Sequence, residues 1–242
     1  MKNTSVLSLL AIAAVSFAGL SLTSQTAKAE PATTGPLVVA ELFTSQSCSS
    51  CPPAEALFSE LAEQDNLLTI EWHVDYWDTL IHGGSKWKDP YSDKAFTARQ
   101  RSYNQSLRGT RAVYTPQAII NGDTEDVGNR RAAVASLVND AAALPLSVQI
   151  VNNTVTIGAS ETPVEVSFIR LLKQHETNVK GGENKGRKLH GKHIVLDVEL
   201  LGTTQTSEMR FNIPAVGDGE TCAVLVQSLT GDIGPILGAA KC

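Results

Sequence analysis

"TSQSCSSCPPAEALF", Thr44–Phe58, places two cysteines where a strand ends and a helix begins. The preceding run "LVVAELFT", residues 37–44, is mostly apolar and rich in β-forming residues, which predicts a buried strand. After the cysteines, apolar residues recur at helical spacing and form one face: Ala54, Leu57, Phe58 and Leu61. Pro52 and Pro53 fit the first turn of a helix, whose amides have no intrahelical partner. The prolines therefore place the start of the helix at the cysteines.

Cys48 and Cys51 form a C-x-x-C motif at this predicted helix start. Amide groups and the dipole of a helix N-terminus lower the pKa of a thiol, and the thiolate is the species that attacks disulfides. We expect Cys48, on the loop side, to be the exposed attacking thiol. We expect Cys51, in the first helical turn, to be more buried and to resolve the mixed disulfide.

Two other interpretations of the cysteine pair stay open. The pair can be a structural disulfide, although so small a loop stabilises a fold only weakly. The pair can also hold a soft metal such as Cu(I), together with His73 or His82. Neither histidine spacing matches a zinc pattern, so we predict no metal site and no cofactor.

The N-terminus predicts export. An apolar stretch from Val6 to Leu20 follows Lys2, and Ala27 and Ala29 give the small-x-small pattern of a cleavage site. We therefore predict a signal peptide over residues 1–29, a periplasmic or secreted protein, and no membrane span after cleavage. Cleavage removes two of the 20 basic residues and none of the 25 acidic ones, so the formal net charge becomes −7. Such a chain has no general attraction for nucleic acid.

Two halves of the chain differ in pattern. Over residues 36–144 strands and helices alternate, which predicts a mixed or parallel sheet covered by helices. After Pro145 the segments alternate apolar and polar residues between turn signals, which predicts an antiparallel sheet in a small sandwich. We therefore predict two domains, residues 36–144 and residues 145–242. The basic stretch from Lys180 to His193 is interpreted as a solvated hairpin loop rather than a phosphate site.

Three further residues are candidates for roles in or near the site. A buried Asp75 would accept the proton of Cys51, and the alternative is a turn or helix-cap residue at the end of a strand. Cys222 and Cys242 are interpreted as a structural disulfide that ties the C-terminus to a strand, worth about 3 kcal/mol by loop entropy. The alternative is a shuttle pair that exchanges with Cys48.

Several blocks of this sequence resemble the DUF1223 family of exported bacterial proteins, which have a thioredoxin-like domain. The blocks run from about Val38 to Ala240 and include "VVAELFTSQSCSSCPPAEALFSELA", "WHVDYWD", "WKDPYSDKAFTARQRSYNQSL", "VYTPQAIING", "GGENKGRKL" and "VLVQSLTGDIGPILGAA". The resemblance implies a thioredoxin-like fold with its redox motif at Cys48 and Cys51. It also implies a cis bond between Thr115 and Pro116, whose backbone would pair with an incoming peptide; without it, a trans bond is the expectation.

We therefore predict an exported thiol–disulfide oxidoreductase that acts on protein or small-molecule thiols and disulfides. The sequence does not say whether the pair oxidises, reduces or isomerises, since that depends on its reduction potential. There are two alternatives. One is a soft-metal carrier that uses the C-x-x-C. The other is an interaction protein that functions through its C-terminal sheet and whose disulfide is not catalytic.

Overall fold

The computed structural model describes residues 1, 36–82, 84–204 and 206–242. The predicted signal peptide lies outside the described residues, apart from Met1. The described residues from position 36 to Cys242 form one compact unit. In the described part of the chain, no helix has both the length and the apolar composition that crossing a membrane requires.

The described residues form three helices and eleven strands. The helices are α1 (Pro52–Leu61), α2 (Lys94–Arg108) and α3 (Arg131–Asp140). The strands are β1 (Val38–Thr44), β2 (Leu67–His73), β3 (Gln117–Ile120), β4 (Thr124–Val127), β5 (Val148–Val151), β6 (Thr154–Ile157), β7 (Val164–Asn178), β8 (Lys188–Thr204), β9 (Met209–Asn212), β10 (Glu220–Ser228) and β11 (Ile236–Lys241).

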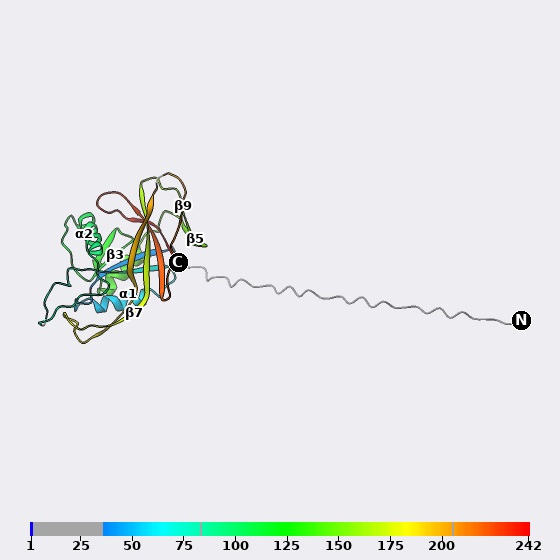
Figure 1. Cartoon of the computed structure of the whole chain (residues 1–242). Coiled ribbons are helices and arrows are strands. Elements are labelled where there is room, and N and C mark those ends of the chain that lie inside the picture. Colours follow the sequence, from blue (N-terminus) through cyan, green and yellow to red (C-terminus); the bar gives the residue numbers. More distant parts are fainter. Residues whose placement is uncertain (2–35, 83, 205) are drawn as a thin grey trace. The chain divides into compact units, whose positions relative to one another are not determined.

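Eight strands form one mixed sheet in the order β11-β10-β7-β8-β2-β1-β3-β4. Figure 1 shows the long strands of its C-terminal part, coloured yellow-green to red, side by side. β1 runs parallel to β2 and antiparallel to β3, and β8 meets β2 in parallel where Ile194 faces Glu71. Strands before and after residue 145 therefore belong to the same sheet. The predicted division into two domains at Pro145 is wrong, because this pairing joins the two halves into one compact unit.

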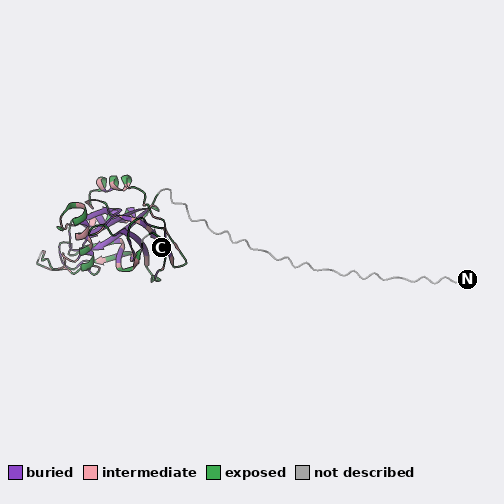
Figure 2. Ribbon diagram, turned by 90° about the horizontal axis from the view of Figure 1, so that it is seen from above, coloured by how far each residue is buried: buried purple, intermediate pink, exposed green. Residues whose placement is uncertain are grey.

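Helices cover both faces of the sheet around β1, so this strand is buried along its whole length. Val39 and Phe43 pack with Phe96 and Tyr103 of α2, whereas Leu42 packs on the opposite face with residues of α1 and α3. A strand buried on both faces is expected to be almost continuously apolar, which explains the composition of "VVAELFT". Figure 2 shows that the buried residues are concentrated in the strands.

A second, three-stranded sheet has the order β5-β6-β9. Val155 and Ile157 of β6 pack against Val166 and Phe168 of β7 and against residues of β10. Two sheets therefore enclose an apolar core after residue 145. This sandwich-like packing was predicted, but it is part of the larger unit and shares β7 and β10 with the main sheet.

Candidate redox site at the start of the first helix

Cys48 and Cys51 form a disulfide between β1 and α1. β1 ends at Thr44, and Cys51 is the N-cap residue of α1. The carbonyl of Cys51 accepts hydrogen bonds from the amides of Ala54 (2.8 Å) and Glu55 (3.1 Å), which begins the helix at the cysteine. The strand–cysteine–helix arrangement predicted from Thr44–Phe58 is confirmed.

Thr115 and Pro116 lie beside this disulfide although they are far away in the sequence. The carbonyl oxygen of Thr115 is 3.9 Å from Sγ of Cys48, and the Thr115–Pro116 bond is cis, as the family resemblance implied. Trp77 fixes the loop, because its indole N–H donates to Oγ1 of Thr115 at 2.8 Å. β3 begins at the next residue, Gln117, and pairs with β1, which places this loop next to the cysteines.

Cys48 is completely buried, with 0% of its surface exposed. The predicted exposed attacking thiol is therefore wrong for this conformation. The segment Gly181–Asn184, between β7 and β8, lies against the cysteine loop and contributes to this burial. Asn184, itself 0% exposed, donates from Nδ2 to the carbonyl of Gln46 at 3.0 Å and to that of Cys48 at 2.8 Å. We call Gly181–Asn184 the covering segment.

Two more contacts hold the covering segment in place. Ser49 donates its amide to the Glu183 carboxylate at 2.8 Å, and Glu183 donates its amide to the carbonyl of Ser47 at 3.3 Å. Gly182 has a φ of +69°, and a Cβ there would lie 2.9 Å from Oγ of Ser47, so only glycine fits comfortably. The solvated loop predicted over Lys180–His193 is therefore partly wrong, because the covering segment packs on the cysteine loop and the residues from Lys188 onward belong to β8.

Asp75 does not contact the cysteine loop through any hydrogen bond found among the described residues. Its Oδ1 accepts from Oγ1 of Thr97 at 2.5 Å, and its amide donates to the same hydroxyl at 3.1 Å. These bonds tie the end of β2 to the first turns of α2. The structure therefore favours the turn-residue interpretation of Asp75 over the proton acceptor.

Glu55 is the buried carboxyl that follows Cys51 by one helical turn. It is 1% exposed, and its Oε1 accepts from Oγ1 of Thr44 at 2.7 Å. Residues four apart share one face of a helix, so Glu55 and Cys51 lie on the same side of α1. Burial raises the pKa of Glu55 to about 6. The signal for this residue in the sequence is an acidic side chain inside the apolar turn "AEALF".

Glu55 makes the stability of the protein depend on pH. Its folded pKa of about 6 lies above the ordinary value of 4.5, so its stabilising contribution is complete below pH 4.5 and is lost as pH rises through 6. A shift of this size corresponds to about 2 kcal/mol. We expect a Glu55→Gln variant, measured by urea unfolding, to gain about that much relative to wild type between pH 4.5 and pH 7. A constant difference across this range would contradict the assignment.

Cys222 and Cys242 form the second disulfide. Cys222 is 3% exposed in β10, and Cys242 follows the end of β11 and donates its amide to the carbonyl of Cys222 at 3.0 Å. The bond therefore ties the C-terminus to a neighbouring strand, as predicted for a structural disulfide. Neither residue is hydrogen-bonded to the Cys48 loop among the described contacts.

Comparisons with known proteins give a family and two structural relatives. The family model described as "Protein of unknown function (DUF1223)" matches residues 39–227. The crystal structure of protein AGR_C_4864 from Agrobacterium tumefaciens is 31% identical, with a TM-score of 0.69 over 86% of this chain and 94% of that one. HBP35 of Porphyromonas gingivalis shares the fold at 13% identity, with a TM-score of 0.53 over 85% of this chain and 74% of that one. No curated protein matches the chain.

Proposed function

This chain belongs to the DUF1223 family of proteins of unknown function, and we propose that it is an exported thiol–disulfide oxidoreductase with a thioredoxin-like fold. One observation carries the proposal. The Cys48–Cys51 disulfide closes at the N-terminus of α1, and the carbonyl of Thr115 lies 3.9 Å from Sγ of Cys48. A thiolate at Cys48 would have the helix dipole to stabilise it, and the Thr115 backbone would offer a hydrogen-bonding edge to a substrate.

The proposed reaction moves two electrons and two protons. In the reducing direction, the Cys48 thiolate attacks one sulfur of a substrate disulfide and forms a mixed disulfide, while the other substrate sulfur leaves as a thiolate and takes up a proton. The Cys51 thiol then loses its proton to Glu55 and attacks Sγ of Cys48. The second substrate sulfur leaves as a thiolate and takes up the proton from Glu55, and the Cys48–Cys51 disulfide remains. Oxidation of a substrate dithiol follows the same steps in reverse.

A substrate reaches Cys48 only if the covering segment moves away. The hydrogen bonds from Asn184 and to Glu183 hold this segment over the loop, so the described conformation is the closed one. The bonds are few, and the opening of a local segment needs less free energy than unfolding of the whole protein. We therefore propose that the disulfide reacts from an open state in which residues 181–184 have left the cysteine loop.

Trapping experiments test the proposal directly. A Cys51→Ser variant is expected to accumulate mixed disulfides through Cys48 when it is incubated with oxidised glutathione or a disulfide-bonded peptide, because the resolving thiol is missing. The wild type is expected to exchange disulfides with glutathione or to reduce insulin in the presence of a reductant. Mass spectrometry of the adducts and an insulin turbidity assay measure the two results.

Two control variants separate catalysis from general thiol reactivity. Cys48→Ser keeps one cysteine of the pair and is expected to form no adduct in the folded protein. A Cys222→Ser/Cys242→Ser variant is expected to retain the exchange activity of the wild type. The enzyme proposal would be contradicted if the protein, shown to be folded by circular dichroism, formed no adducts and exchanged no disulfides.

The second candidate is an interaction protein whose Cys48–Cys51 disulfide is structural, and the complete burial of Cys48 favours it. In that case reductants should reach the bond only when the whole unit unfolds. The soft-metal carrier has less support. Among the described residues the one cluster of possible metal ligands includes no cysteine, so neither His73 nor His82 completes a site with Cys48 and Cys51.

A further inference from the structure

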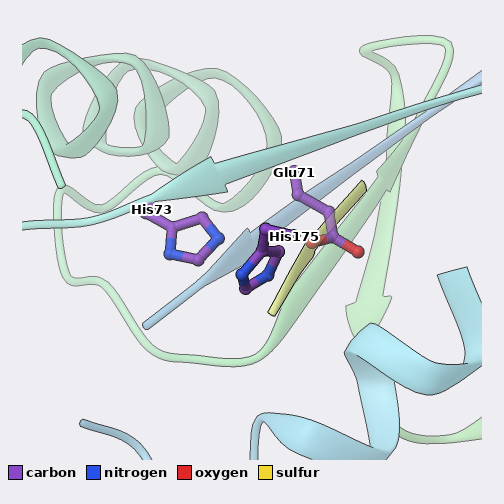
Figure 3. A group of neighbouring side chains, drawn as sticks. All are labelled: Glu71, His73 and His175. Carbon is purple, nitrogen blue, oxygen red and sulfur yellow. The ribbon is translucent and has the colours of Figure 1, made fainter. Parts of the chain in front are cut away.

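Three buried side chains from two strands converge beneath α1. Glu71 and His73 alternate along β2 and so lie on the same face of the sheet, and His175 comes from β7. One oxygen of Glu71 and one nitrogen of each histidine all lie within 4.8 Å of one another. Figure 3 shows the two imidazole rings and the carboxylate next to one another. Glu71 and His73 are 0% exposed, and His175 is 8% exposed.

These side chains keep their coordinating atoms unpaired. Among the described residues, both oxygens of Glu71 and Nε2 of His73 and of His175 have no hydrogen-bond partner. The amide of Lys192 points toward the Glu71 carboxylate but makes no hydrogen bond of good geometry to it. Buried polar atoms without partners are costly, so four of them in one place need an explanation.

The opposite side of each imidazole is held by a partner. Nδ1 of His73 is 2.7 Å from Oδ2 of Asp89, a buried carboxylate, and Nδ1 of His175 is 3.3 Å from Oγ1 of Thr177. A carboxylate at Nδ1 keeps the proton there and directs the lone pair of Nε2 away from it. Metal-binding histidines in proteins are oriented in the same way by an outer hydrogen-bond partner.

A glycine and a cavity complete the cluster. A Cβ at Gly191 would lie 2.5 Å from Oε2 of Glu71 and 2.8 Å from Nε2 of His175, so a side chain there would fill the space between the two. A cavity of about 510 Å³ is lined by His175 and Gly191 and also by His190. The cavity reaches the cluster at His175, the one of the three side chains that lines it.

We propose that Glu71, His73 and His175 bind a divalent zinc ion through Nε2 of each histidine and a carboxylate oxygen. Two imidazoles and one carboxylate are the donor set of many zinc sites that keep a fourth position for water. Bonds of about 2.0–2.2 Å to one ion require the ligand atoms to lie about 3.3 Å apart. The present separations are at most 4.8 Å, so the ligand atoms would move together by up to about 1.5 Å when the ion binds. The fourth position would face the cavity.

The proposed ion site includes no cysteine, but hydrogen bonds connect its ligands to the cysteine loop. Asp89 accepts a hydrogen bond from the amide of Gln46, in the cysteine loop, through the same oxygen that contacts His73. Gln46 also donates from Nε2 to Oγ1 of Thr177, the partner of His175. The two histidines and the cysteine loop therefore share their supporting residues. Because no cysteine is a ligand, zinc should bind while both disulfides are intact.

Metal titration of the oxidised protein tests the proposal. The chain is stripped with a chelator, its lack of free thiols is confirmed after denaturation, and Zn²⁺ is added in a calorimeter. We expect one Zn²⁺ per chain, checked by elemental analysis after gel filtration. Co²⁺ used as a probe should show visible ligand-field bands of a low-coordinate site without sulfur-to-metal charge transfer. Failure of the wild type to bind Zn²⁺ stoichiometrically would overturn the proposal whatever the variants do.

Variants then assign the ligands. Glu71→Gln and His175→Gln are expected to weaken Zn²⁺ binding by at least about 100-fold, since loss of even an outer partner costs about 10–100-fold. His190→Gln, in the same cavity, is the matched control and should keep the wild-type affinity. Each variant is checked for folding by circular dichroism. Unchanged affinity in folded Glu71 and His175 variants, equal loss in the control, or binding that appears only after disulfide reduction would each contradict this site.

Discussion

Replacing Glu41 by alanine is expected to lower the free energy of unfolding by about 3–5 kcal/mol. Glu41 lies in the middle of β1 and is 0% exposed. Arg99 of α2 donates from Nε to its Oε1 at 2.8 Å, and Tyr103 donates its hydroxyl to Oε2 at 2.6 Å. The alanine variant would leave the Arg99 charge, whose side chain is 18% exposed, without its partner inside the protein.

The measurement is urea unfolding of wild type and variant at pH 7, followed by circular dichroism. Glu60→Ala is the control, because Glu60 also pairs with an arginine, Arg131, but both side chains are 61% exposed. Solvent screens such a pair, so the control should leave stability almost unchanged. A loss of less than about 1 kcal/mol in Glu41→Ala would show that the Arg99 charge finds another partner or water.

Local sequence patterns predicted the elements that surround the cysteines. The strand expected at residues 37–44 and the helix expected to begin at the cysteines both form within one or two residues of these positions. Each depends on a repeat of apolar residues over neighbouring turns or alternate positions, which a short window of sequence contains.

Contacts between distant residues could not be predicted in this way. β8 meets β2 through Ile194 and Glu71, and nothing in either segment identifies the other as its neighbour. Asn184 reaches the cysteine loop in the same way, across 136 residues from Cys48. His175 joins His73 from another strand, so no local histidine spacing could signal the cluster. Sequence therefore indicated the position of the cysteine pair at the start of α1 but neither the segment that lies against it nor the buried polar cluster.

Replacing Asn184 by alanine is expected to speed reduction of the Cys48–Cys51 disulfide by about 30-fold. The side chain donates two hydrogen bonds to backbone carbonyls of the cysteine loop. Bonds of this kind contribute about 1 kcal/mol each, and 2 kcal/mol corresponds to about a 30-fold larger open population. When opening is fast compared with chemistry, the rate of reaction follows the open population, so reduction accelerates by the same factor.

Dithiothreitol under pseudo-first-order conditions, with alkylation and mass spectrometry at each time, measures the reduction rate. Lys185→Ala changes the exposed neighbour of Asn184 and should leave the rate unchanged. Arg187→Ala should give a smaller acceleration than Asn184→Ala, because Arg187 donates to Oδ1 of Asn184 at 2.7 Å and only orients its amide. Equal rates in all four proteins would mean that reductant reaches Cys48 by a route that does not involve residues 181–184, and the covering segment would then have no part in access to the disulfide.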